Sequence, residues 1–398
     1  MQKQLTSVLL VAGTAIGGGT IALPMVLAKL GIIPSLTIMI AIWLLTYYMS
    51  LASVELNLHS DHGLSLGALG EKFSGPVAQA IGEFSVKLLS YALLAVYIYG
   101  AASIIQKLIS EYLQWEISLI AVESAVAVSA MITLLFPMKI VSKINNVAFS
   151  GFILILLILI AAISVSIDCS QIPWFGNVSI NNTLSVITVV FTSFGYQIIF
   201  HTLRDYLGKS AGAIKRAFFY GSLIPTAVYM LWTSSALSVI YKSAPNFFTK
   251  MTGGNVEVGD FVNELANISG LPYFQTLIWC MSILAISTSI FGVGLGLAES
   301  INLGLSSHVK SAGSRNLLAS VATVLPAYIV AAIVPNAFIS ILGFAGAILV
   351  IIAILLPAYL FFKSGIEKPY LKELKKWPII LCCIIGIGIM MIEICSHF

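Results

Sequence analysis

Residues 13–24 read GTAIGGGTIALP, and this stretch decides which kind of helix opens the chain. It lies inside a long apolar run over residues 5–30. The consecutive residues Gly17, Gly18 and Gly19 each lower helix stability by about 1 kcal/mol, and Pro24 removes a further backbone donor. Glycines that only allow two helices to pack closely lie on one helix face, whereas three in a row point in all directions. The stretch therefore predicts a helix that unwinds near its middle.

The composition places this interrupted run in a membrane. Of the 398 residues, 59% are hydrophobic and 9% are charged, against about 25% charged in soluble domains. A soluble enzyme, a disordered regulator and a nucleic-acid binder are thereby disfavoured. We expect an all-α integral membrane protein that forms one domain over 1–398, because backbone groups must pair within the bilayer and strand alternation is absent. Eleven runs approach the roughly 20 residues of a spanning helix: 5–30, 34–56, 77–107, 117–136, 145–167, 184–204, 213–240, 272–302, 313–333, 336–362 and 377–396.

Lysine and arginine are unevenly distributed between the loops that join these runs. With the N-terminus inside, fifteen of the 20 basic residues fall on the inner side and four on the outer side. Cytoplasmic loops carry such an excess of positive charge. We therefore expect a cytoplasmic N-terminus, a periplasmic C-terminus and an outward-facing long loop over 241–271.

A second interruption is predicted in the sixth run, where residues 191–197 read FTSFGYQ. Small, polar and aromatic residues follow one another where this run crosses the middle of the bilayer. Paired interruptions at matching places in two halves are typical of transporters built from inverted repeats. The expected repeats are 1–167 and 184–362, five helices each, and 377–396 adds an eleventh helix.

The two breaks also predict the chemistry of a binding site. A broken helix exposes free N–H groups at one end and free C=O groups at the other, each end carrying about half an elementary charge. An amino acid zwitterion needs both signs close together. We expect its carboxylate to meet the amides of Gly18, Gly19 and Thr20. We expect its ammonium to meet the carbonyls near Ala12, Gly13, Phe191 and Ser193.

Two other classes of membrane protein fit these residues less well. An integral-membrane enzyme acting on lipids would show clustered Asp, His or Cys at membrane depth. A channel would show a ring of charged residues or a repeated carbonyl filter. The sequence displays neither pattern, and it predicts no metal site and no cofactor. A secondary transporter that is not an enzyme is the favoured class.

Five motifs follow one another along nearly the whole chain: GTAIGGGTIALP (13–24), ELNL (55–58), YALLAVYIYGA (91–101), FTSFGY (191–196) and STSIFGVGLGLAES (287–300). Together they resemble the tyrosine/tryptophan-specific permease family of bacterial transporters, within the amino acid–polyamine–cation superfamily. The resemblance implies a five-plus-five (LeuT-like) fold with discontinuous helices 1 and 6. It also implies inner-membrane uptake of tyrosine and/or tryptophan by cation symport, usually with protons. The alternatives are sodium coupling and a broader neutral amino acid permease.

The expected substrate-binding residues come from both breaks and from two neighbouring helices. From the breaks they are Gly13, Thr14, Ala15, Gly17, Gly18, Gly19, Thr20, Phe191, Ser193, Phe194, Gly195 and Tyr196. The family match favours Tyr91 as a stacking wall for an aromatic substrate, and the alternative is that it packs against lipid or another helix. Ser287, Thr288 and Ser289, in the eighth run, are candidates to face the first break.

The candidates for coupling to a cation are Gln197, His201, Glu83, Glu123 and Thr288. Gln197 and His201 stand where members of the resembled family often have a histidine and a proline. A charge at the centre of a bilayer costs about 2.5–3.5 kcal/mol, which makes Glu123 a candidate proton relay. The alternative to a coupling role for Glu83 is a neutralising i, i+4 pair with Lys87. Thr288 has the alternative of a hydrogen bond to its own helix.

Overall fold

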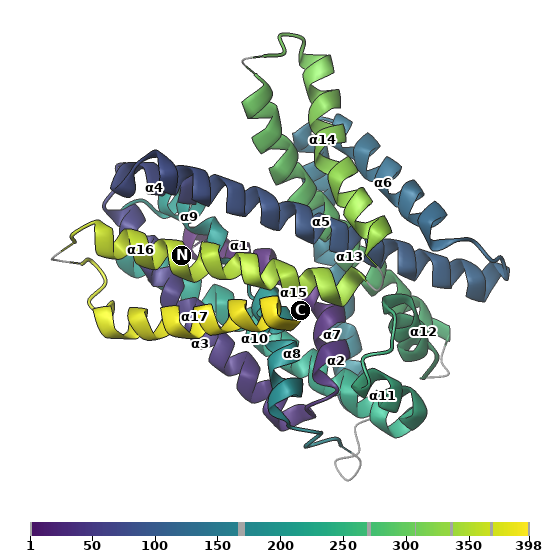
Figure 1. Cartoon of the computed structure of the whole chain (residues 1–398). Helices are drawn as coiled ribbons and strands as arrows, with labels where there is room; N and C mark the ends of the chain where they lie inside the picture. Colours follow the sequence, from purple (N-terminus) through teal and green to yellow (C-terminus); the bar gives the residue numbers. More distant parts are fainter. Residues whose placement is uncertain are drawn as a thin grey trace.

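The structure is a computed structural model that describes residues 2–165, 172–268, 272–306, 308–334, 337–366 and 369–396. Within these residues the chain consists of helices joined by loops, without a β-strand (Figure 1). The expected all-α integral membrane fold is confirmed.

The first run forms two helices, α1 (Gln2–Ala15) and α2 (Gly19–Leu27), which are bent by 53° at the break between them. Pro24 lies inside α2. Among the described residues, nine further helical segments are long and apolar enough to cross a membrane, and the bent pair makes ten. These nine are α3 (Ile32–Leu58), α5 (Pro76–Leu113), α7 (Met138–Val165), α8 with α9, α10 (Ala211–Ser243), α13 (Pro272–Leu305), α14 (Ala312–Ile333), α15 with α16, and α17 (Lys376–Ser396). The shorter apolar helix α6 (Leu119–Leu135) has 17 residues and occupies the fourth predicted run.

Two of the spanning segments contain irregular turns. The segment 180–207 consists of α8 (Ile180–Ser193), the 3-10 turn η1 (Gln197–Ile199) and α9 (Phe200–Leu207). The segment 337–363 consists of α15 (Ala337–Val350), the π-helical turn η2 (Ile351–Leu355) and α16 (Leu356–Lys363). Such π-turns inside α-helices often mark functional positions.

Three short helices lie in the connecting loops. α4 (Leu66–Ser74) begins where Ser65 caps it by accepting a hydrogen bond from the Ala68 amide. Gly75, with φ of 99°, then turns the chain into α5, whose first residue is Pro76. The long loop predicted to face outwards contains α11 (Pro245–Thr252) and α12 (Val258–Ile268).

The helix α2 lies at the centre of the molecule. Every one of its residues is buried, and it packs against α8, α10, α11 and α12. By contrast, the outer faces of α7 and α17 expose apolar side chains such as Leu154 and Leu381. A membrane-spanning bundle exposes apolar side chains on its outside because lipid surrounds it. It buries an interrupted helix inside because irregular backbone must be kept away from lipid.

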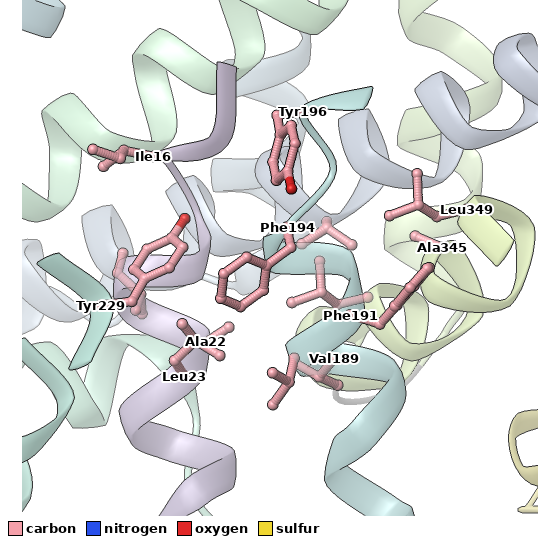
Figure 2. Packing of buried hydrophobic residues seen from close by; sticks show 14 of the residues in the cluster. Ile16, Ala22, Leu23, Val189, Phe191, Phe194, Tyr196, Tyr229, Ala345 and Leu349 are labelled. Atoms are coloured by element: carbon pink, nitrogen blue, oxygen red, sulfur yellow. The ribbon is translucent and has the colours of Figure 1, made fainter. Parts of the chain in front are cut away.

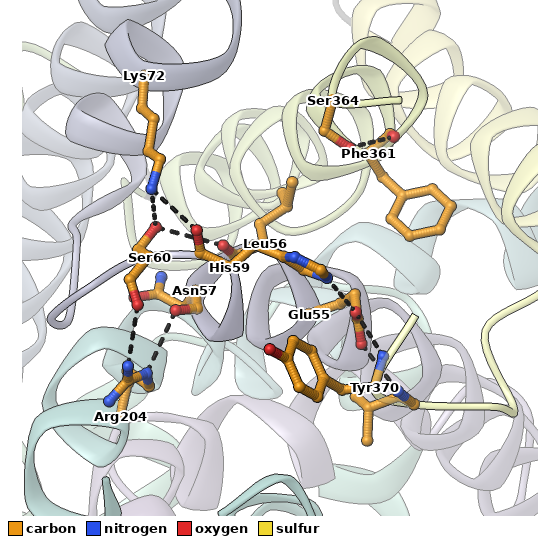
Figure 3. A network of polar contacts seen from close by, with 11 residues as sticks. Glu55, Leu56, Asn57, His59, Ser60, Lys72, Arg204, Phe361, Ser364 and Tyr370 are labelled. Carbon is orange, nitrogen blue, oxygen red and sulfur yellow. Dashed lines mark hydrogen bonds and ion pairs between the residues drawn. The ribbon is translucent and has the colours of Figure 1, made fainter. Parts of the chain in front are cut away.

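Two fully buried charges tie the ends of several helices together (Figure 3). Glu55, near the end of α3, accepts hydrogen bonds from the backbone amides of Tyr370 at 2.8 Å and Leu371 at 2.9 Å. Arg204 of α9 donates to the carbonyl of Ser60 at 2.9 Å. A buried charge is tolerated when it is hydrogen-bonded. These contacts fasten α3 to α9 and to the segment that precedes α17.

Candidate functional site

The first break leaves two backbone donors free. The Ile16 amide still donates to the Ala12 carbonyl at 3.1 Å, and the Thr20 amide donates to the Gly17 carbonyl at 3.0 Å. In the described part of the chain, the amides of Gly18 and Gly19 have no hydrogen-bond acceptor. Because α2 begins here, both donors point out of the N-terminal end of a helix.

Helix α10 holds this break from the side. The Tyr229 hydroxyl donates to the Ala15 carbonyl at 2.6 Å, and the Trp232 Nε1 donates to the Thr20 carbonyl at 2.6 Å. The two side chains are three residues apart on α10, so they share one helix face, and both are fully buried. They fix the last residue of α1 and the first turn of α2 independently of any ligand.

The second break lies beside the first. α8 ends at Ser193, and residues 194–196 are not helical. The Phe194 ring packs edge-on to Tyr229, with 5.9 Å between ring centroids, and Figure 2 shows it between the two interrupted segments. The Tyr196 hydroxyl lies 3.2 Å from the hydroxyl of Thr46. Helices α2 and α8 are in contact, so the two predicted interruptions meet in space.

A cavity of about 550 Å³ opens on the α1 side of the first break. Its walls come from α1 and the break after it, α5, α7, η1 and α13, and they include Gly13, Thr14, Ala15, Gly17, Lys87, Tyr97, Asn145, Phe149, Ile198, Thr288 and Ser289. Gly17 and Gly18 form the closest contacts. A Cβ atom at Gly17 would lie 2.7 Å from Ser289 Oγ, and one at Gly18 would lie 2.7 Å from Tyr97 Cε1. A side chain at Gly18 would therefore strike the Tyr97 ring, and one at Gly17 would displace the Ser289 hydroxyl.

The other expected residues of the breaks are buried around this centre. A Cβ at Gly19 would lie 2.9 Å from the Ser193 side chain, and one at Gly195 would lie 3.5 Å from Leu349. The Thr20 hydroxyl donates to the Gly17 carbonyl at 2.8 Å. Phe191 is fully buried, as are Phe194 and Tyr196. The structure thus gathers the candidates of both breaks, although Gly18, Gly19, Thr20 and the expected residues of the second break do not line the cavity.

Two expected residues lie elsewhere. Tyr91 donates to the Ala322 carbonyl of α14 at 2.8 Å and faces a different pocket. Ser287 is not part of the cavity wall, whereas Ser289 is. On α5 it is Tyr97 that reaches the break, with its hydroxyl near Ser289. On both α5 and α13 a neighbouring side chain, Tyr97 or Ser289, lines the cavity beside the break instead.

The coupling candidates are spread over the molecule. Gln197 is 1% exposed, and within the described residues neither of its amide atoms has a hydrogen-bond partner. His201 is half-buried in α9. The Thr288 hydroxyl donates to the Leu284 carbonyl of its own helix at 2.8 Å. This is the hydrogen bond given above as the alternative to a role of Thr288 in coupling.

The two glutamates among these candidates lie away from the breaks. Glu83 is exposed and accepts a hydrogen bond from Gln79. The pair of Glu83 with Lys87 is absent from the ion pairs that the described residues form, and Lys87 lines the central cavity instead. Glu123 lines a separate cavity formed by α5, α6, α12 and the end of α14.

Sequence reasoning missed two polar residues next to the site. Asn145 of α7 lines the cavity, and its buried Oδ1 has no hydrogen-bond partner among the described residues. Glu393 of α17 is 8% exposed and accepts a hydrogen bond from the Thr188 hydroxyl of α8 at 2.8 Å. A lone carboxyl inside an apolar run is a signal that the sequence did offer for Glu393.

Comparison with known proteins identifies the family. The model of the tryptophan/tyrosine permease family matches residues 1–395. The chain is 27% identical to "Tyrosine-specific transport system 2" of Haemophilus influenzae over 401 residues, covering 98% of this chain and 96% of that protein. It is 27% identical to "Low affinity tryptophan permease" of Escherichia coli (strain K12), covering 91% and 87%. It is also 27% identical to "Glutamine transporter 2" of Aliivibrio fischeri, covering 89% and 87%. The resemblance inferred from the motifs is confirmed, and the chain belongs to the tryptophan/tyrosine permease family.

Proposed function

We propose that the protein imports an aromatic amino acid, tyrosine and/or tryptophan, across the bacterial inner membrane as a secondary active symporter. The observation that carries this proposal is the pair of free amides at Gly18 and Gly19, buried beside a cavity of about 550 Å³. Free amides at a helix N-terminus bind anions such as carboxylates. The printed names of two relatives, a tyrosine-specific and a tryptophan transporter, support an aromatic substrate.

The cavity walls suit an aromatic side chain. Tyr97 and Phe149 both line it. Contact between aromatic rings contributes about 0.5–1.5 kcal/mol beyond the burial of area. In the proposed binding mode the carboxylate lies at the Gly18 and Gly19 amides, and the substrate ring extends along Tyr97 into the cavity.

Transport follows from alternating access between two five-helix repeats, 1–167 and 184–362. The support for this proposal is the pairing of two interrupted spans, five spans apart, that contact one another. The cavity opens along α1, which begins at the N-terminus. With that terminus in the cytoplasm, as the loop charges predict, this conformation is inward-facing. We propose the proton as coupling cation, and sodium, held near Thr288 and Ser289, as the alternative.

A second candidate substrate class is polar neutral amino acids such as glutamine. One relative is named a glutamine transporter. In addition, the unpaired Oδ1 of Asn145 in the cavity would accept a hydrogen bond from a side-chain amide. A buried acceptor without a partner costs about 1–3 kcal/mol, and an amide substrate would relieve that cost.

Uptake into proteoliposomes tests the function. Radiolabelled tyrosine is supplied outside, with an imposed pH gradient that is alkaline inside, with and without sodium. We expect accumulation that requires the pH gradient and that unlabelled tyrosine and tryptophan suppress. Suppression by glutamine alone would establish the second candidate, and a requirement for sodium would replace the proton. No accumulation of any amino acid by folded protein would remove the proposal.

A further inference from the structure

A second cavity, of about 480 Å³, lies apart from both breaks. It is formed by α5, α6, the start of α12 and the end of α14. Its volume falls within the range of small-molecule sites. None of the residues of the two breaks lines it, so the proposed transport function does not account for it.

Glu123 presents an unpaired carboxylate oxygen to this cavity. Glu123 is 1% exposed, and its Oε2 atom has no hydrogen-bond partner in the part of the chain that the structure describes. Glu257, just before α12, also lines the cavity and accepts a hydrogen bond from the Tyr99 hydroxyl at 2.8 Å. Tyr99 is itself 4% exposed. Two carboxylates from different elements therefore line one open cavity.

The cations around the cavity do not balance these carboxylates. Lys107 is the basic residue in the described wall, and it pairs with Asp260 at 2.8 Å. Glu123 and Glu257 remain without a positive partner among the lining residues. A carboxylate that is removed from water requires a counter-charge or a set of donors. A cation in the cavity would supply that counter-charge.

The shape and the rim of the cavity favour an organic cation over a metal ion. Among the described residues, no group of three or more His, Cys, Asp or Glu side chains is arranged to hold a metal. Part of the wall is apolar: it includes Leu119 and Ile120, one turn before Glu123 on α6, and Ile333 at the end of α14. Ile120 is 57% exposed and Ile333 is 72% exposed, so apolar side chains share the mouth with the partly exposed pair of Lys107 and Asp260. An ammonium group with three donors matches the carboxylates, and an apolar tail matches the mouth.

We propose that this cavity is a second binding site, for a primary organic ammonium ion with an apolar tail and without a carboxylate. The ammonium group lies between Glu123 and Glu257 and donates to the free Oε2 of Glu123. A free amino acid is disfavoured, because its carboxylate would meet two like charges. The ligand would bridge α6 to α12, which already contacts α5 through a hydrogen bond from the Gly259 amide to Ser103 Oγ at 2.9 Å.

Titration calorimetry on the purified full-length protein in lipid nanodiscs tests this site, with 2-phenylethylammonium as the probe. We expect 2-phenylethylammonium to bind saturably to the wild-type protein. The neutral 2-phenylethanol is expected not to bind. Glu123→Gln and Glu257→Gln are each expected to weaken binding at least tenfold. The matched control is Glu299→Gln, which makes the same change in a different groove and is expected to leave the affinity within twofold.

Two further measurements separate this cavity from the central one. Gly18→Leu, which fills the first break, is expected to keep the affinity for 2-phenylethylammonium, and saturating tyrosine is expected not to displace it. Bound probe is also expected to slow amide hydrogen exchange over residues 257–262. If Glu123→Gln does not yield folded protein, Glu257→Gln decides. Absence of binding, equal binding by all variants, or displacement by tyrosine would overturn the proposal.

Discussion

Replacing Gly18 by alanine tests the geometry of the first break most directly. The added Cβ would lie 2.7 Å from Cε1 and 3.5 Å from Cδ1 of Tyr97. The first separation is too short for two carbon atoms, and the Tyr97 ring is only 9% exposed, so it is confined by its neighbours. Overpacking of this kind costs about 1–3 kcal/mol. If that strain falls on the substrate-binding conformation, uptake at low substrate decreases by roughly 5- to 150-fold.

The assay is the initial rate of tyrosine uptake by proteoliposomes that contain equal amounts of folded protein. Gly292→Ala is the matched control, because a Cβ there meets no atom within 4 Å although Gly292 lines the same cavity. We expect the control to transport within twofold of the wild-type protein and to gain up to about 1 kcal/mol in stability from helix propensity.

A double mutant identifies the cause of the loss. Tyr97→Leu removes the ring that the new methyl group would strike. If the strain lies between these two residues, the effects of Gly18→Ala and Tyr97→Leu are not additive, and the double mutant transports better than the sum of the two losses predicts. Wild-type uptake by Gly18→Ala, or additive losses in the double mutant, would refute the contact on which the site is built.

Three further perturbations follow from individual contacts. Tyr229→Phe removes the hydrogen bond to the last carbonyl of α1. Because an unsatisfied buried carbonyl costs about 1–3 kcal/mol, thermal unfolding in detergent should show a lower midpoint at unchanged expression. Glu393→Leu deprives the Thr188 hydroxyl of its acceptor and should slow uptake, whereas Glu393→Gln keeps an acceptor and should retain more than half of the exchange rate of the wild-type protein. The Lys215 ammonium holds the pKa of the Glu373 carboxyl below its ordinary value of 4.5. The pair therefore stabilises the fold fully above pH 4.5, and this stabilisation is lost as the pH falls through the lowered pKa of Glu373. Because both side chains are partly exposed, Lys215→Met should cost no more than about 1 kcal/mol at pH 7. This cost, measured by chemical unfolding, should shrink as the pH falls below 4.5.

The positions of the two breaks were predictable because their causes are local. Three consecutive glycines destabilise a helix wherever they occur, and the helix is interrupted at Ile16, Gly17 and Gly18. The second interruption, at 194–196, lies inside the predicted motif. The apolar lengths of the spans were predictable for a similar reason, since the thickness of the bilayer sets them.

The orientation of side chains on the central helices was not predictable. α5 buries Leu94, Val96 and Ile98 as well as Tyr97 and Tyr99, so both of its faces are covered by neighbours. A helix that is apolar all round gives no periodic signal to show which side faces the site. Tyr91 was preferred to Tyr97 because of the family match alone, and positions six residues apart on a helix point in different directions, so only one of the two side chains faces the break.

The hydrogen bonds around the first break occupy most of the acceptors described there but leave the amide donors of Gly18 and Gly19 free. This difference bears on how a zwitterion binds. The carbonyls of Ala15 and Thr20 are occupied by α10, and those of Ala12 and Gly17 accept from the chain itself. Of the carbonyls expected to hold an ammonium, those of Ala12 and Phe191 accept from the Ile16 and Phe194 amides, while the donors of Gly18 and Gly19 remain free. In the proposed binding mode the first break therefore receives the anionic end of the substrate, and Tyr229 and Trp232 of α10 already hold both half-helices in place. This binding mode leaves the ammonium to the remaining carbonyls of the two breaks or to acceptors across the cavity, so that both halves of the chain would contribute to binding one amino acid.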